Sequence, residues 1–156
     1  MNKIIKNWQE LSRIITSVRP GKKIVFTNGC FDILHIGHIH YLKEARSLGD
    51  YLVLAINSDE SVRKLKGEER PLQNQEDRSE ILAALECVSF VSVFAEPTPL
   101  EIIKVVKPDI LVKGGDWPEE KIIGYDFVKS YGGVTKSLRF VEGRSTTAIV
   151  EKIKRL

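Results

Sequence analysis

The 156-residue chain has little of what marks several protein classes. Its two cysteines, Cys30 and Cys87, are too few for a disulfide framework, which favours a reducing compartment and predicts a cytoplasmic location. No run approaches the ~18 apolar residues of a membrane span. The charged stretch Met1–Lys6 also lacks the apolar region of a signal peptide. A secreted disulfide-stapled domain and a membrane protein are therefore not expected.

An excess of charge of one sign is also missing. The chain has 24 Lys and Arg against 21 Asp and Glu, a formal charge of +3. Dedicated nucleic-acid binders carry a basic stripe instead, so we expect neither a nucleic-acid partner nor a membrane partner. Hydrophobic residues make up 42% of the chain, and its length suits one domain. We predict a single domain over residues 1–156 that acts on small, anionic substrates.

The N-terminus has an amphipathic pattern. Apolar residues at helical spacing predict a helix within residues 1–20, with its buried face formed by Ile4, Trp8, Leu11, Ile15 and Val18. Pro20 and Gly21 end this pattern, and we expect the catalytic core to occupy residues 22–156.

Strand-like and helix-like patterns then alternate. We predict strands over residues 23–27, 51–57, 90–94, 109–112 and 134–141. Helices are predicted over residues 35–48, 74–86, 99–106 and 145–154, and a short helix with a mobile loop over 58–73. In the helix over 74–86 we expect Ile81, Leu82 and Leu85 to point inward. This alternation predicts a Rossmann-like, doubly wound α/β fold with a five-stranded parallel sheet, whose ligand lies beyond the carboxyl ends of the strands.

The segment Thr27–His38 joins a predicted strand to a predicted helix. His35 and His38 lie three residues apart, so they share a face near a helix N-terminus, where free N–H groups attract phosphate. Gly37 between them leaves the backbone open to a ligand. We predict a site in which two imidazoles stabilise an anionic transition state. The alternative, a metal site that adds Asp32 or Cys30, has few ligands for structural zinc. No base is expected beside Cys30, so we predict no thiolate nucleophile.

Two further loops carry chemistry. Lys113–Trp117 contains paired glycines, which permit a tight turn or a close approach to a nucleotide. There Asp116 would face a ribose or a metal and Lys113 a phosphate, whereas Trp117 is more typical of packing. Gly143–Thr147 precedes the last helix with three hydroxyl residues, more than one helix cap needs, and the surplus suits phosphate oxygens. The role of Arg144 is open.

His35-Ile36-Gly37-His38 and Ser145-Thr146-Thr147 resemble the motifs of nucleotidyltransferases of the cytidylyltransferase type. The longer segments 27–42, 83–88, 108–117 and 141–150 resemble the D-glycero-β-D-manno-heptose 1-phosphate adenylyltransferase family more narrowly. The resemblance runs from about Lys22 to the C-terminus. In many bacteria this activity is one half of a bifunctional protein that also contains a sugar kinase.

The resemblance implies a nucleotidyltransferase-type fold and the transfer of AMP from ATP to heptose 1-phosphate, which gives ADP-heptose and pyrophosphate for lipopolysaccharide inner-core synthesis. His35 and His38 would be catalytic. The nucleotide and its phosphates would be bound by Thr27, Asn28, Gly29, Phe31, Asp32, Gly37, Lys113, Gly115, Asp116, Gly143, Ser145, Thr146 and Thr147. Arg70 or Arg78 would hold the sugar phosphate; Arg78 stands at a helix start, where the dipole disfavours a cation. Mg²⁺ would accompany ATP, held mainly by phosphates and water. A homodimer and a separate heptose kinase are the expected partners.

The nearest alternative is a glycerol-3-phosphate cytidylyltransferase, which would make CDP-glycerol from CTP. That family typically has Arg-Thr where this chain has Phe140-Val141, and Arg where it has Glu86, so both departures favour the heptose enzyme. A non-catalytic nucleotide-binding regulator is a second alternative, and the intact histidine and Ser-Thr-Thr motifs argue against it.

Overall fold

The computed structural model describes residues 2–139 and 141–156, and Phe140 therefore lies outside the described residues. Within them, five strands form one parallel sheet in the order β3-β2-β1-β4-β5. The strands are β1 (Ile24–Gly29), β2 (Tyr51–Asn57), β3 (Phe90–Phe94), β4 (Ile110–Gly114) and β5 (Val134–Leu138). The helices are α1 (Trp8–Val18), α2 (Ile36–Ser47), α3 (Asp59–Lys66), α4 (Gln75–Ala83), α5 (Leu100–Val106), the 3₁₀ turn η1 (Glu119–Lys121), α6 (Tyr125–Ser130) and α7 (Thr146–Lys154).

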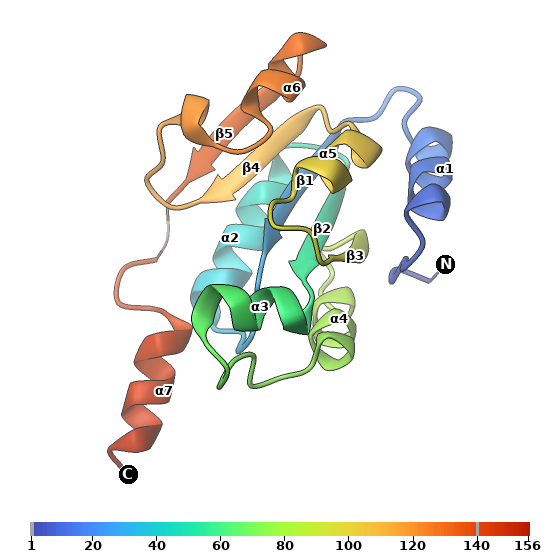
Figure 1. Cartoon of the computed structure of the whole chain (residues 1–156). Coiled ribbons are helices and arrows are strands. Elements are labelled where there is room, and N and C mark those ends of the chain that lie inside the picture. Colours follow the sequence, from blue (N-terminus) through green and yellow to red (C-terminus); the bar gives the residue numbers. More distant parts are fainter. Residues whose placement is uncertain (1, 140) are drawn as a thin grey trace.

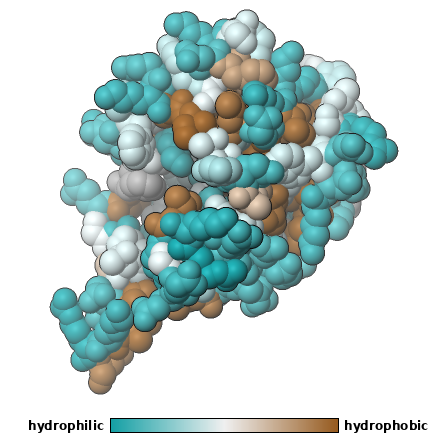
Figure 2. Space-filling view, viewed as in Figure 1, coloured by the Kyte–Doolittle hydropathy of each residue, from teal (hydrophilic) through white to brown (hydrophobic). Residues whose placement is uncertain are grey.

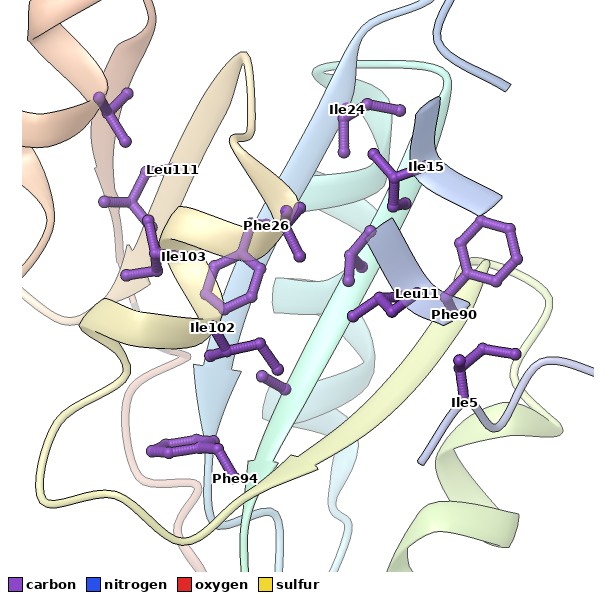
Figure 3. Packing of buried hydrophobic residues seen from close by; sticks show 14 of the residues in the cluster. Ile5, Leu11, Ile15, Ile24, Phe26, Phe90, Phe94, Ile102, Ile103 and Leu111 are labelled. Carbon is purple, nitrogen blue, oxygen red and sulfur yellow. The ribbon is translucent and has the colours of Figure 1, made fainter. Parts of the chain in front are cut away.

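Helices cover both faces of the sheet, so the predicted doubly wound α/β fold is confirmed (Figure 1). Successive strand residues point to opposite faces. On one face Phe26 and Leu111 pack with α1, α5 and α6, as Figure 3 shows for Leu11 and Ile102. On the other face α2 and α4 cover the alternate strand residues. Because β2 is covered on both faces, it can be apolar at nearly every position.

The N-terminal segment differs from its prediction. The helix begins at Trp8, capped by the Asn7 side chain, and not at Ile4. Ile4 instead forms a parallel bridge with Val91 of β3, and the N–H of Ile5 donates to the Val91 carbonyl. The edge of the sheet offers unpaired backbone groups, and this extended segment satisfies part of them.

Two other predicted elements need correction. Helix α4 ends at Ala83 rather than at residue 86, and Ile81 is 38% exposed; Arg78, Ser79 and Leu82 form its buried face. The last strand ends at Leu138, short of the predicted residue 141. Helix α7 then extends away from the sheet and has no buried residue, and apolar side chains lie on its surface (Figures 1 and 2).

Candidate active site

The site lies at the carboxyl edge of the sheet, where β1 and β4 are neighbours. After β1 the chain turns to α2 on one face, and after β4 it turns to η1 and α6 on the other. This divergence opens a crevice, the usual ligand position in doubly wound sheets. A hollow in it is lined by Asn28, Gly29, Cys30, Phe31, Asp32, His38, Tyr41, Lys66, Lys113, Gly114 and Thr146.

The two predicted histidines lie together at the start of α2. Their rings stack with centroids 3.9 Å apart, and His35 is the N-cap residue of the helix. The N–H of Gly37 donates to Nδ1 of His35 at 3.1 Å, and the N–H of His35 donates to Nδ1 of His38 at 3.4 Å. In a neutral imidazole whose Nδ1 accepts, the proton is on Nε2. Each ring therefore keeps one N–H donor for a ligand.

The surroundings keep His38 neutral. Burial, the neighbouring His35 and the cation of Lys66 lower the pKa of His38 to about 4. Burial also lowers the pKa of His35. At neutral pH His38 is therefore a neutral hydrogen-bond donor rather than a cation.

Gly37 has a steric reason to be glycine. A Cβ at this position would lie 2.9 Å from the ring of His35, too close for any side chain. At Gly29, a Cβ would lie 2.8 Å from the ring of Phe31, which itself has φ of 47°. Thr27 is buried and shares a hydrogen bond with the Tyr41 hydroxyl, so it supports the base of the hollow.

Asp32 does something other than the predicted contact with a nucleotide. Its side chain is only 1% exposed and accepts from Nε of Arg70 at 2.7 Å. It also accepts from the backbone N–H groups of Leu72 and Gln73. Burial alone would raise the pKa of Asp32, but these hydrogen bonds and the arginine lower it below its usual value. Asp32 thus fastens the segment 70–73, part of the predicted mobile loop, to the histidine loop.

Arg78 does not fit a sugar phosphate. Its side chain is 0% exposed, and its guanidinium donates to the carbonyls of Gln73 and Cys30 and to the carboxylate of Asp59. Arg78 instead connects three segments of the chain, those that contain Cys30, Asp59 and Gln73. Because this side chain is fully buried, its guanidinium is not accessible to a sugar phosphate in the hollow, so the prediction for Arg78 is wrong.

The hydroxyl residues at the start of α7 divide their roles. Ser145 caps the helix by accepting from the N–H of Ala148 at 3.0 Å. Thr146 reaches the hollow and donates to the carbonyl of Ile33, in the loop before α2. Thr147 lines an adjoining groove with Lys66 and Arg70. The N-termini of α2 and α7 therefore lie near each other, and the free backbone N–H groups of both can bind an anion.

Nη2 of Arg70 is buried and has no hydrogen-bond partner among the described residues. A buried, unpaired guanidinium nitrogen is costly unless a ligand satisfies it. Arg70 itself lines the groove with Lys66 and Thr147, beside the start of α7.

The loop after β4 contributes in part. Lys113 lines the hollow, and burial lowers its pKa. Gly115, Asp116 and Gly143 are not among the residues that line it. Trp117 is 53% exposed, so the packing role predicted for it is wrong.

Sequence reasoning missed Lys66 and Tyr41. Lys66 lies at the end of α3 and lines both the hollow and the groove beside α7. Tyr41 is one turn after His38 on α2, so the spacing of three could have marked it. Lys66 gives no comparable signal, since only the fold brings α3 beside α2 and α7.

The described residues, 2–139 and 141–156, bring no three His, Cys, Asp or Glu side chains together as a metal site. The oxygens of Asp32, a ligand of the alternative metal site, already accept from Arg70 and the backbone. No helix in the same part of the chain is long and apolar enough to cross a membrane.

Known proteins are similar to this chain in sequence. The cytidylyltransferase-like family matches residues 26–152. The chain is 56% identical to the bifunctional protein HldE of Geobacter metallireducens over 152 residues, which are 97% of this chain and 31% of that protein. It is 51% identical to the HldE of Aliarcobacter butzleri over 98% of this chain and 32% of that protein. The chain thus spans about a third of the length of these relatives.

Solved structures agree with the fold. A lipopolysaccharide core biosynthesis protein from Thermoplasma volcanium superimposes with a TM-score of 0.63 and 31% identity, over 80% of this chain and all of that one. The pantoate-β-alanine ligase of Francisella tularensis superimposes with a TM-score of 0.66 over all of this chain and 79% of that chain. Its 18% identity indicates a shared fold alone. The family match and the HldE relatives confirm the resemblance to heptose 1-phosphate adenylyltransferases that the sequence motifs indicated.

Proposed function

The chain belongs to the cytidylyltransferase-like family, and on that premise we propose that it transfers AMP from ATP to heptose 1-phosphate. The products are ADP-heptose and pyrophosphate, and ADP-heptose serves lipopolysaccharide inner-core synthesis. One observation carries the proposal: His38, whose ring stacks on His35, and Thr146 of the α7 start line one crevice, where a phosphate chain would meet donors from both sides. The HldE relatives and the lipopolysaccharide core biosynthesis protein support the choice of substrate.

The reaction needs no protein nucleophile. An oxygen of the sugar phosphate attacks the α-phosphorus of ATP, a new P–O bond forms, and the bond to the β-phosphate oxygen breaks in line. The Nε2–H groups of His35 and His38 donate to the α-phosphoryl oxygens as charge develops. Both rings are held in place before ATP arrives, His35 by its hydrogen bond to the helix backbone and His38 by the stack. Little reorganisation is therefore needed in the transition state.

The leaving pyrophosphate has its own cationic surroundings. Lys66 adjoins both the histidine hollow and the groove beside α7, where Thr147 and Arg70 lie. We therefore propose that Arg70 binds the β- and γ-phosphates of ATP rather than the sugar phosphate. Nη2 of Arg70 is the donor that would gain a partner when they bind. The free N–H groups at the start of α7 add to this site.

A divalent cation accompanies the nucleotide in enzymes of this family, and we propose that it is Mg²⁺. The described residues assemble no metal site from side chains alone. We propose that this cation arrives with ATP and takes its ligands mainly from phosphate oxygens and water. Such an ion would neutralise charge on the triphosphate. Asp116, exposed in the loop after β4, stays the candidate for the ribose.

The test compares two nucleotides and two acceptors. Pyrophosphate release by the purified chain is measured with ATP or CTP, and with heptose 1-phosphate or glycerol 3-phosphate. We expect the highest kcat/KM for ATP with heptose 1-phosphate. Faster turnover of CTP with glycerol 3-phosphate would favour the cytidylyltransferase instead. Nucleotide binding without pyrophosphate release from any pair would favour a regulator.

Other features belong to the same proposal. Exposed apolar residues on α7 and at the C-terminus, Ile153 and Leu156, are consistent with a homodimer. We expect a heptose kinase activity to act upstream, because the acceptor is a sugar phosphate. The free thiols of Cys30 and Cys87 fit the proposed cytoplasmic location. Sedimentation of the purified chain would measure the oligomeric state.

A further inference from the structure

A second hollow lies beside the first, on the opposite face of the sheet. Asn28 and Lys113, at the ends of β1 and β4, line both. From there the first hollow extends toward α2 and Thr146, and the second toward Pro99 before α5 and Ile122 after η1. Ile122 belongs to the core on the α5 face, whereas Tyr41 belongs to the core on the α2 face. The two hollows therefore meet at the crevice from opposite sides.

We propose that the second hollow binds the sugar ring of the acceptor, and that Trp117 and Lys121 select a ring of this class. The inference rests on the proposed function. Trp117 is 53% exposed, and its backbone N–H donates to the Ser137 hydroxyl at 3.1 Å, which ties the loop that carries the indole to β5. An exposed indole at the wall of a hollow offers a flat apolar surface, and the C–H face of a pyranose can lie against it.

The in-line geometry of the reaction places the acceptor in this second hollow. The leaving pyrophosphate lies toward α7, where Lys66, Arg70 and Thr147 gather. In an in-line displacement the attacking oxygen approaches from the side opposite the leaving group. The second hollow lies across the Asn28–Lys113 boundary from Thr146, so it opens on that side.

The polar groups also fit a sugar phosphate better than the other candidate, the adenine base. Lys113 on the boundary and Lys121 at the wall are cations, and Asn28 adds an amide. An acceptor with an anionic phosphate and several hydroxyls can use such donors, with its phosphate at Lys113 and its ring against Trp117. Adenine is uncharged, so it gains less from two lysines than an anionic phosphate does.

The experiment measures separate KM values for the two substrates. Trp117→Ala and Lys121→Ala should each raise the KM for heptose 1-phosphate about tenfold and leave the KM for ATP within about twofold. Trp117→Phe keeps a flat ring and should retain most of the affinity. For glycerol 3-phosphate, which has no ring, Trp117→Ala should have a smaller effect. Lys129→Ala on α6, an exposed lysine that does not line the hollow, is the matched control.

A binding measurement supplements the kinetics. The chain has two tryptophans, and Trp8→Phe on α1 leaves Trp117 as the single indole reporter. Heptose 1-phosphate should change its fluorescence more than a non-hydrolysable ATP analogue does. A rise in the KM for ATP alone would assign the hollow to the base and overturn the proposal, and so would unchanged KM values for both substrates. If wild-type protein transfers AMP to no sugar 1-phosphate, the proposed function itself fails.

Discussion

Replacing Asp32 tests how the site is built, because this carboxylate joins the histidine loop to segment 70–73. Its side chain is 1% exposed and that of its partner Arg70 is 17% exposed. Removing one member of a buried ion pair typically costs about 3–5 kcal/mol, because the other charge stays buried without compensation. The N–H groups of Leu72 and Gln73 lose their acceptor as well. We expect Asp32→Ala to lower the free energy of unfolding by about 4 kcal/mol.

For a domain of this size, ~1 kcal/mol corresponds to roughly 2–4 °C in Tm, so the expected drop is about 8–16 °C. Urea unfolding followed by circular dichroism measures the free energy directly. Asp32→Asn keeps the shape but loses the charge, and it should cost about 1–3 kcal/mol. Glu101→Ala, which removes an exposed pair with Lys104, is the control and should cost less than about 0.5 kcal/mol. A loss below ~1 kcal/mol in Asp32→Ala would refute the anchoring role.

The lowered pKa of Asp32 predicts how its contribution to stability depends on pH. Because this pKa is lowered in the folded protein, the stabilisation is present above the unfolded value of about 3.9 and disappears as the pH falls through the folded value. The gap in stability between wild type and Asp32→Asn should therefore narrow in acid below about pH 4. A gap that stays constant there would contradict the assignment of the charge.

Further predictions concern the chemistry. His38→Ala should reduce turnover by on the order of 10²–10³ while the circular dichroism spectrum is kept, because one preorganised donor is lost; near-normal turnover would be incompatible with its role. The His38 ring should titrate near pH 4 in an NMR experiment, and a midpoint above 6 would show that the ring is solvated. Because this pKa is lowered in the folded protein, the free energy of unfolding should be unaffected by His38 above about pH 6.5 and should decrease as the pH falls toward 4. Lys66→Ala should reduce kcat/KM for ATP at least tenfold by removing a cation beside the phosphates, whereas Lys64→Ala, on the same helix but outside the site, should not. No covalent nucleotidyl-enzyme should form with α-labelled ATP, and an adduct of nucleotide mass on Lys113 or Cys30 in denaturing mass spectrometry would overturn direct transfer.

The sequence by itself determined the architecture. The β-rich run over 51–57 and the strand over 90–94 were predictable to the residue because both are apolar at nearly every position, as is typical of parallel strands in a covered sheet. The histidine pair was predictable because local spacing alone puts residues 35 and 38 on one face at the start of α2. The hydroxyl residues at the start of α7 were also predictable, because they are adjacent in the sequence and precede an apolar helical pattern.

Only the tertiary structure decided what long-range contacts do. Arg70 and Arg78 look alike in the sequence, yet Arg70 lines the groove beside α7 and has an unpaired nitrogen, whereas Arg78 is fully buried. Asp32 resembles a ligand in a ligand-binding loop, and its role became clear only when residue 70, 38 positions away, proved to be its partner. Lys66 joins the site because α3 packs near α2, and Trp117 is exposed because no element covers it among the described residues. The hydrophobic pattern of the sequence shows which face of a single helix or strand is buried. The partners of a charged side chain depend instead on which helices, strands and loops the fold brings side by side.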